Sequence, residues 1–122
     1  MKRAVLLISH GSRSPKAKHE VIRLACVLKK RSGVPICCAF LEINKPSIVS
    51  GIRQCVQKGA TEIIILLNFL NSGDHALKDI PRFIEQAKKK FPRISFRMTP
   101  PIGQHAHIPN PFLDVLRRVY RY

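Results

Sequence analysis

Hydrophobic residues along this chain form two kinds of pattern: short continuous runs, and longer segments in which they recur every three or four positions. The continuous runs are rich in Val, Ile and Leu, which is typical of strands buried on both faces of a sheet. Four such strands are predicted, at residues 4–8, 34–41, 63–67 and 94–98.

The segments between these runs have the spacing of amphipathic helices. The first helix is predicted over residues 15–30, with Ser14 in the capping position and Gly33 beyond the end. The later helices are predicted to open at Pro46, at Pro81 and at Asn110-Pro111.

Strands and helices therefore alternate in the order βαβαβαβα. Such alternation requires right-handed crossovers and produces a parallel sheet with helices on both faces. The predicted fold class is α/β, with a four-stranded parallel sheet in one domain over residues 1–122, because no linker or repeat divides the chain. Ligands of such sheets bind beyond the carboxyl ends of the strands. If the reaction requires a cleft with two sides, a second copy of the chain would have to supply one side.

Three chemically distinctive residues follow predicted strands and should meet at that edge. His10 comes directly after the first strand, Glu42 after the second, and His75 after the third. A neutral imidazole binds Fe²⁺, Co²⁺, Ni²⁺ or Zn²⁺ and also accepts a proton near neutral pH. The two histidines thus predict a site that holds a metal ion or moves protons, with Glu42 as a further candidate ligand. The alternatives are hydrogen-bonding roles for the histidines and an exposed, lysine-paired acid for Glu42.

The loop after the first strand also has the features of an anion site. Gly11-Ser12-Arg13 leads from a strand into a helix start, where backbone N–H groups attract negative charge and Arg13 can grip a carboxylate or phosphate. The same residues are equally consistent with a tight turn and a helix cap. Neither the dinucleotide-binding nor the P-loop glycine motif occurs, which argues against a nucleotide.

A second pair of histidines follows the fourth strand. His105 and His107 are two residues apart, so in an extended segment both side chains point to the same side. This spacing allows weak metal coordination, and the alternative is a solvated loop with two exposed imidazoles.

Two groups of residues are predicted to face the core. The last helix should bury one apolar stripe, formed by Phe112, Leu113, Leu116 and Val119. The cysteines lack the spacing of a metal cage, and free Cys packs as a small hydrophobe. All four are therefore assigned to the core: Cys26, Cys37, Cys38 and Cys55.

Composition and charge narrow the range of partners. The chain has 122 residues, of which 45% are hydrophobic, and its 22 Lys and Arg against seven Asp and Glu give a formal net charge of +15. The electrostatic field of this positive charge attracts anions over the whole surface, so an acidic partner is expected. No apolar run approaches the ~20 residues of a membrane span, and the start lacks a signal-peptide core. A cytoplasmic protein without a membrane partner is the expectation.

Three blocks of sequence resemble a known family. They are Ser9-His10-Gly11-Ser12-Arg13, then Phe69-Leu70-x-x-Gly73-x-His75-x-x-x-Asp79-Ile80-Pro81, and finally Pro101-Ile102-Gly103-x-His105. In this order they resemble the small class II tetrapyrrole chelatases, the sirohydrochlorin chelatase group that includes the short cobalt chelatases of cobalamin synthesis. The second block is the most specific of the three.

The resemblance implies a chelatase-like fold and insertion of a divalent metal ion into sirohydrochlorin or a related polycarboxylate tetrapyrrole, for cobalamin or sirohaem. It places two active-site histidines at His10 and His75. The metal would be a substrate, with Co²⁺ expected first, Fe²⁺ close behind and Ni²⁺ third, and no permanently bound cofactor is expected. Short family members look like half of the longer chelatases, so a homodimer is predicted. The residues expected to bind the tetrapyrrole are Gly11, Ser12, Arg13, Gly73 and His105.

Two other functions compete with this hypothesis. A basic nucleic-acid-binding module would use runs such as Lys88-Lys89-Lys90 to neutralise phosphates, but the chain has few aromatic residues and no recognised binding motif. A phosphate-handling enzyme of the histidine type would use His10 as nucleophile and Arg13 as anion clamp. This hypothesis does not explain the sequence block from Gly73 to Pro81.

Overall fold

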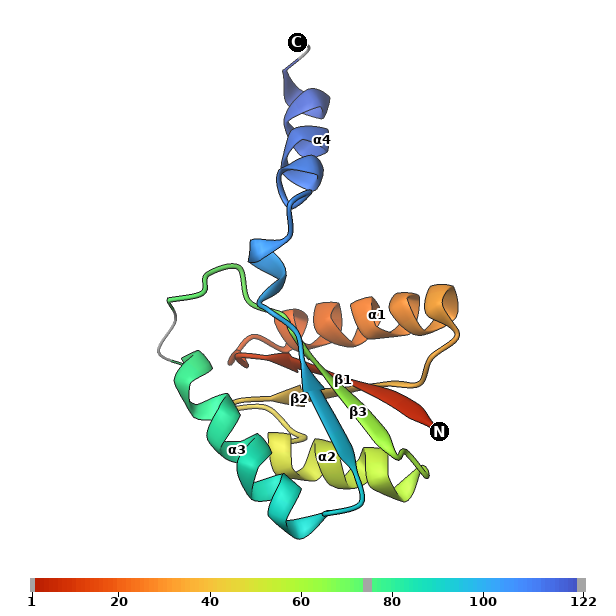
Figure 1. Ribbon diagram of the computed structural model, residues 1–122. Helices are drawn as coiled ribbons and strands as arrows, with labels where there is room; N and C mark the ends of the chain where they lie inside the picture. Colours follow the sequence, from red (N-terminus) through yellow and green to blue (C-terminus); the bar gives the residue numbers. More distant parts are fainter. Residues whose placement is uncertain (1, 74–75, 121–122) are drawn as a thin grey trace.

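The four strands form one parallel sheet in the order β2-β1-β3-β4, as the computed structural model of residues 2–73 and 76–120 shows (Figure 1). The α/β class and the alternation of elements are confirmed. The elements are β1 (Arg3–Ser9), α1 (Pro15–Ser32), β2 (Ile36–Phe40), α2 (Ile48–Gln57), β3 (Glu62–Leu67), α3 (Ala76–Lys90), β4 (Ser95–Met98), the short 3₁₀ helix η1 (Ile102–Gln104) and α4 (Pro109–Val119).

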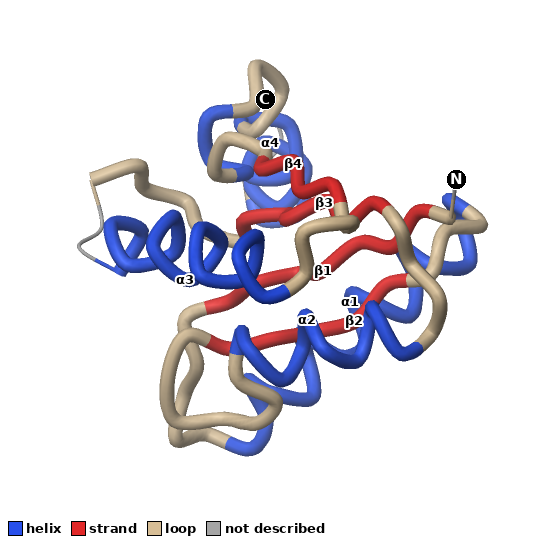
Figure 2. Tube along the Cα trace, turned by 60° about the horizontal axis from the view of Figure 1, so that its bottom comes forward, coloured by secondary structure: helices blue, strands red, loops and turns tan. Residues whose placement is uncertain are grey.

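Helices cover both faces of the sheet, with α1 on one face and α2 and α3 on the other (Figures 1 and 2). Alternate residues of the two central strands, β1 and β3, are completely buried against α2 and α3; these are Leu6, Ile8, Ile63 and Ile65. Both central strands are continuous hydrophobic runs because they are buried on both faces. The carboxyl ends of all four strands therefore meet at one edge of a rigid sheet.

Helix α1 starts where the sequence predicted, but α2 and α3 do not. Ser14 caps α1, and Gly33 ends it with a left-handed φ of 73°. Ser47 caps α2, so Pro46 lies outside the helix that it was expected to open. The start predicted for α3 at Pro81 is also wrong, because this proline lies inside the helix. The fully buried Ile80 explains the difference, since packing on the sheet holds the helix together across the proline.

The predicted burial of the last helix is wrong. Instead α4 projects from the carboxyl edge of the sheet (Figure 1). Its predicted stripe is in solvent, with Phe112 56%, Leu116 45% and Val119 71% exposed, while Leu113 is half-buried. Periodicity identifies an apolar face of a helix but not the surface that covers it.

Two of the four cysteines are in the core as predicted. Cys37 and Cys55 are buried, but Cys38 is half-buried and Cys26 is exposed, so the prediction is wrong for the last. Burial and the neighbouring Cys37 raise the pKa of the Cys55 thiol to about 12. This thiol is therefore not a nucleophile near neutral pH.

None of the described helices combines the length and the hydropathy needed to cross a bilayer.

Replacement of Gly51 by valine should destabilise the fold. A Cβ at this position of α2 would lie 2.9 Å from both the Ala39 Cβ and the Leu6 Cδ1, so helix and sheet would have to separate. Overpacking of this kind costs about 1–3 kcal/mol, measured as the free energy of unfolding in urea. Arg53→Val places the same side chain on an exposed position of α2 and should change that free energy by less than about 0.5 kcal/mol. Equal effects of the two changes would contradict close packing at Gly51.

Candidate functional site

The ladder of backbone hydrogen bonds continues beyond the ends of the central strands. The Glu42 N–H donates to the His10 carbonyl at 3.1 Å, and the Asn68 N–H donates to the Ile8 carbonyl at 2.9 Å. The loops that follow β1, β2 and β3 are thus held side by side, as the parallel topology requires. This pairing brings the predicted His10 and Glu42 together at the carboxyl edge.

The His10 and Glu42 side chains form a direct pair. The His10 Nε2 lies 2.7 Å from the Glu42 Oε1, and the two side chains are 47% and 58% exposed. Because an ionised carboxylate only accepts hydrogen bonds, the Nε2 is the donor in this pair. The carboxylate orients the imidazole, and both groups are accessible to a ligand. The partner of Glu42 is thus this histidine rather than the lysine of the alternative interpretation.

The third residue of the predicted set, His75, lies outside the described residues. Among the described residues no group of three or more His, Cys, Asp or Glu side chains is arranged to hold a metal ion. A metal site built from His10, Glu42 and His75 therefore stays a prediction.

The loop after β1 is built around a glycine in a left-handed conformation. Gly11 has a φ of 109°, and a Cβ there would overlap the Glu42 carbonyl oxygen, so only glycine allows this approach. The Ser12 N–H donates to the Asn44 Oδ1 at 2.7 Å, and the Ser14 N–H donates to the Ser12 Oγ at 3.1 Å. Two amides of the predicted anion site are therefore already occupied within the protein. The exposed Arg13 side chain can still meet an anion.

Sequence reasoning missed Asn44, which fastens the first loop to the second. Its side-chain oxygen accepts the Ser12 N–H, and its own N–H donates to the Glu42 carbonyl at 2.8 Å. The available signal was an asparagine two residues after Glu42, because this residue type often binds nearby backbone in turns.

Gly103 fixes the segment after β4 to the loop after β3. Its N–H donates to the Phe69 carbonyl at 3.0 Å, and a Cβ on Gly103 would overlap the Leu70 backbone. The predicted Gly73 is exposed in the same loop, and no described residue lies within 4 Å of the place where its Cβ would be. The close approach at Gly103 explains the need for glycine there, whereas the structure offers no steric reason for Gly73.

His105 and His107 lie close together, as their spacing suggested. The His107 N–H donates to the His105 Nδ1 at 2.9 Å, and the two ring centroids are 5.5 Å apart. His105 also lines an open hollow of about 330 Å³, whose other lining residues are Leu66, Thr99, Pro100, Pro101, Ile102 and Gln104. Among the described residues, His10 does not line this hollow.

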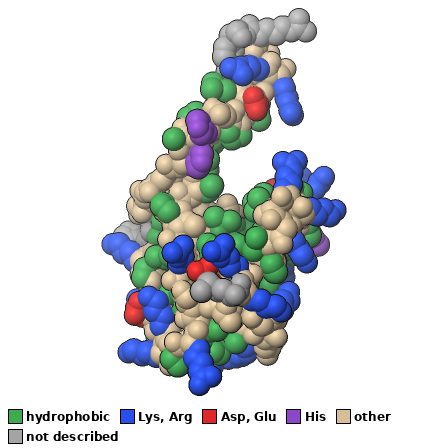
Figure 3. Space-filling view, turned by 45° about the vertical axis from the view of Figure 1, so that its right-hand side comes forward, with side chains coloured by type: hydrophobic (Ala, Val, Ile, Leu, Met, Phe, Trp, Pro, Cys, Tyr) green, Lys and Arg blue, Asp and Glu red, His purple; other side chains and the backbone are tan. Residues whose placement is uncertain are grey.

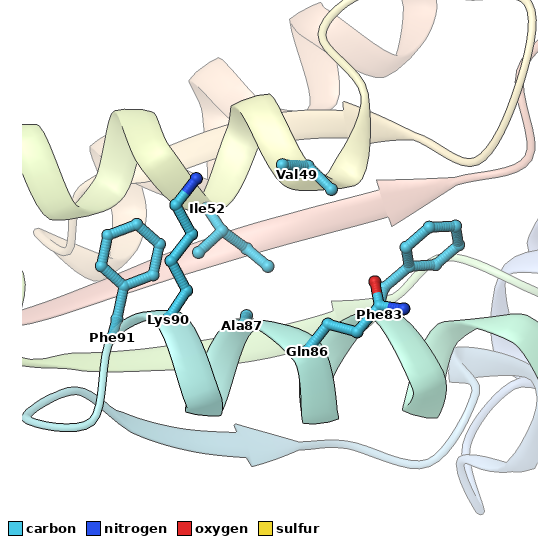
Figure 4. Close-up of a pocket in the computed structure, with 7 residues that line it drawn as sticks. All are labelled: Val49, Ile52, Phe83, Gln86, Ala87, Lys90 and Phe91. Atoms are coloured by element: carbon cyan, nitrogen blue, oxygen red, sulfur yellow. The ribbon is translucent and has the colours of Figure 1, made fainter.

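A small cavity of about 130 Å³ lies elsewhere, between α2 and α3 (Figure 4). Its lining is mainly apolar, and its single charged group, Lys90, has its Nζ 5.7 Å from the centre of the Phe91 ring. Nothing in this lining accepts a proton near neutral pH or binds a metal ion well. The cavity is a gap in helix packing rather than a reaction site.

Comparison with known proteins identifies the family. The CbiX family model matches residues 4–119. The chain belongs to the CbiX family. This confirms the predicted relationship and the chelatase-like fold.

Named relatives are chelatases. Sirohydrochlorin ferrochelatase of Bacillus subtilis is 36% identical over 104 residues, which cover 84% of this chain and 40% of the relative. Sirohydrochlorin cobaltochelatase of Methanocaldococcus jannaschii is 35% identical over 82 residues, covering 66% of this chain and 57% of the relative. The chain thus spans less than two thirds of the length of these relatives.

Solved structures show the same fold. The sirohydrochlorin chelatase SirB from Bacillus subtilis subspecies spizizenii, in complex with cobalt, superposes with a TM-score of 0.89 at 31% identity, over 98% of this chain and 51% of SirB. A CbiX protein from Marinobacter aquaeolei VT8 superposes with a TM-score of 0.85 at 23% identity, over 98% of this chain and 95% of that protein.

Asn44→Ala should loosen the two rim loops without unfolding the sheet. The change leaves the partly buried Ser12 N–H without its acceptor, which costs about 1–3 kcal/mol in the free energy of unfolding. Hydrogen exchange of the Ser12 amide, followed by NMR, should become faster. Asn44→Asp retains an acceptor at the same place and should keep the amide protected. Slow exchange in both variants would show that Asn44 does not hold the loop.

Proposed function

We propose that this chain is a sirohydrochlorin chelatase, which inserts a divalent metal ion into an early tetrapyrrole. The observation that carries the proposal is the exposed His10–Glu42 pair at the carboxyl edge of the sheet, in a chain of the CbiX family. The names of the relatives support the substrate, since both ferrochelatases and cobaltochelatases of sirohydrochlorin are among them.

Metal insertion has two chemical requirements that this pair is suited to meet. The ion must lose water, and the two N–H protons of the macrocycle must leave as the metal–nitrogen bonds form. The His10 imidazole and the Glu42 carboxylate are ligand types that can replace water on the ion, and the carboxylate helps to stabilise a proton taken up by the ring. We assign the second proton acceptor to His75, on the basis of the sequence block that contains it.

The charge of the protein supports a polycarboxylate substrate. The net charge is +15, and Figure 3 shows Lys and Arg side chains distributed over the body of the molecule on the face in view. A long-range field of this kind raises the association rate of a polyanion and weakens with salt. Arg13 is the residue at the edge best suited to bind a substrate carboxylate, because it is exposed and carries a two-pronged donor. Gly11, Ser12, Gly73 and His105 remain further proposed contacts.

We further propose that residues 1–122 act as one domain and that two copies form the complete enzyme. One edge of a four-stranded sheet gives one wall for a flat macrocycle. The second copy would supply the facing wall.

Co²⁺ is the proposed first substrate metal, followed by Fe²⁺ and then Ni²⁺. Imidazole and carboxylate ligands accept all three, so the metal used depends on supply and geometry. Solved SirB structures with cobalt and with Fe³⁺ support the first two. Products would enter cobalamin or sirohaem synthesis in the cytoplasm.

The test is to mix the protein with sirohydrochlorin and Co²⁺ or Fe²⁺ and to follow the visible spectrum. We expect the bands of the free macrocycle to disappear faster than without protein. An unchanged rate with every metal would refute the proposal. Salt-sensitive binding of duplex DNA without insertion would favour the nucleic-acid-binding alternative.

His10→Ala and His75→Ala should each lower the insertion rate by about 100-fold or more, since a lost acid–base group commonly has that effect. Binding of the macrocycle, measured by fluorescence quenching, should survive because affinity is assigned to Arg13 and the positive field. His19→Ala is the control, because His19 is an exposed histidine on α1. Insertion at the wild-type rate in the His10 variant would refute the site and leave the fold untouched.

A further inference from the structure

A hollow with a positively charged lining lies at the amino edge of the sheet, opposite the edge that carries the candidate site. It has a volume of about 260 Å³, and its lining comes from the start of β1, the residue before β2 and the turn after α2: Lys2, Arg3, Ala4, Pro35, Lys58 and Ala60. Within the described part of the chain, this lining contains three cations and no acid. A concave surface of this charge favours an anionic ligand.

Arg3 is held in place by a buried carboxylate. Its Nε donates to the Glu62 Oε1 at 2.8 Å, and the Glu62 side chain is only 7% exposed, whereas that of Arg3 is 63% exposed. A guanidinium has further N–H donors on its two terminal nitrogens, which this bond does not use. The carboxylate thus orients a group that can bind two oxygens of an anion.

The two lysines are also positioned by the body of the protein. The Lys58 Nζ lies 3.6 Å from the Sγ of the buried Cys37, so the ammonium is held against the fold. The Lys2 Nζ lies 3.3 Å from the place that a Cβ of Gly59 would take, and Gly59 has a left-handed φ of 90°. In the described residues, neither lysine forms an ion pair with a carboxylate. Their charges are therefore available to a ligand at little cost in side-chain entropy.

Helix ends raise the positive potential at the same edge. The helices return in the direction opposite to the strands, so their last turns lie at the amino edge (Figure 1). Residues 29–31 of α1 and residues 88–90 of α3 are all Lys or Arg. Cations in a last turn favour the helix dipole, which is sufficient reason for these runs. The same reason does not apply to Lys2 and Arg3, because they lie at the start of a strand.

We propose that the hollow at the amino edge binds a phosphate group. A phosphate monoester carries a charge of about −1.5 to −2 near neutral pH and presents three oxygens, so it can meet Lys2, Arg3 and Lys58 together. A carboxylate has one charge and two oxygens in one plane, and it would leave at least one of the three cations unused. The ligand is either free inorganic phosphate or a small molecule that carries a phosphate. This inference stands apart from the proposed function, since β1 separates the hollow from His10 by roughly 20 Å.

The test is an NMR titration of the ¹⁵N-labelled chain at about 0.15 M salt, with inorganic phosphate, AMP and succinate in separate experiments. We expect the amide signals of Gly59 and Ala60 to shift and to saturate with a Kd of about 1 mM or tighter for one of the two phosphates. Tighter binding of AMP would identify a phosphorylated small molecule as the ligand, and tighter binding of phosphate would identify the free ion. Succinate is a dianion without a phosphate group and should bind at least about tenfold more weakly than the preferred phosphate.

Lys2→Gln and Lys58→Gln should each weaken phosphate binding by about tenfold, because each removes one hydrogen bond between charged groups. Arg3 is left unchanged, since its removal would take the partner from the buried Glu62 carboxylate. Lys30→Gln is the matched control. It removes the same charge from an exposed position in the last turn of α1, outside the lining of the hollow, and should bind phosphate as the wild type does.

Four outcomes would overturn the proposal. They are the absence of saturable binding of either phosphate, binding of succinate as tight as that of phosphate, an equal loss of affinity in the Lys30 variant, and signal shifts confined to residues 11–13 at the opposite edge. The titration contains neither metal nor tetrapyrrole, so the two proposals can fail separately. Metal insertion without phosphate binding would refute this inference alone, and phosphate binding without metal insertion would refute the proposed function alone.

Discussion

The pairing of β1 and β2 beyond their strand ends is the interaction on which the candidate site depends. The backbone bond from Glu42 to the carbonyl of His10 extends the ladder into the loops and sets the two side chains next to each other. Gly11 allows this approach, and Asn44 fastens the two loops together. The sheet, rather than the loops themselves, thus determines where the His10 and Glu42 side chains lie.

Among the described residues, Glu42 is the acidic side chain whose ion-pair partner is a histidine. Glu62, Asp79, Glu85 and Asp114 are paired with Arg or Lys, whereas Glu42 is paired with an imidazole. A surface pair with Arg or Lys contributes little beyond local stability. A carboxylate beside a histidine at an open edge can bind a metal ion and support proton transfer, which is why this pair carries the proposed function.

The C-terminal helix α4 stands apart from the core. The body has a complete core against α2 and α3, yet α4 contributes almost nothing to it. Among the described residues, the groove between α4 and Leu70 is lined by apolar side chains.

The sequence by itself determined the fold class, the order of the strands along the chain and the edge at which the candidate site lies. These follow from short-range patterns, since continuous apolar runs between amphipathic segments leave a parallel sheet as the solution. The meeting of His10 and Glu42 followed from topology as well. His75 was placed at the same edge by the same reasoning, although it lies outside the described residues.

Only the tertiary structure decided the features that depend on what packs against what. The start of α3 ahead of Pro81 is held by the burial of Ile80, and the exposure of Cys26 reflects the side of α1 on which it lies. The sequence did not show that the Ser12 N–H donates to a side chain of the protein, because that bond depends on Asn44 lying beside Ser12 in the fold. The free face of α4 is the clearest case, because a periodic sequence specifies that a helix has an apolar side, whereas the surface that covers it depends on distant parts of the chain or on another molecule.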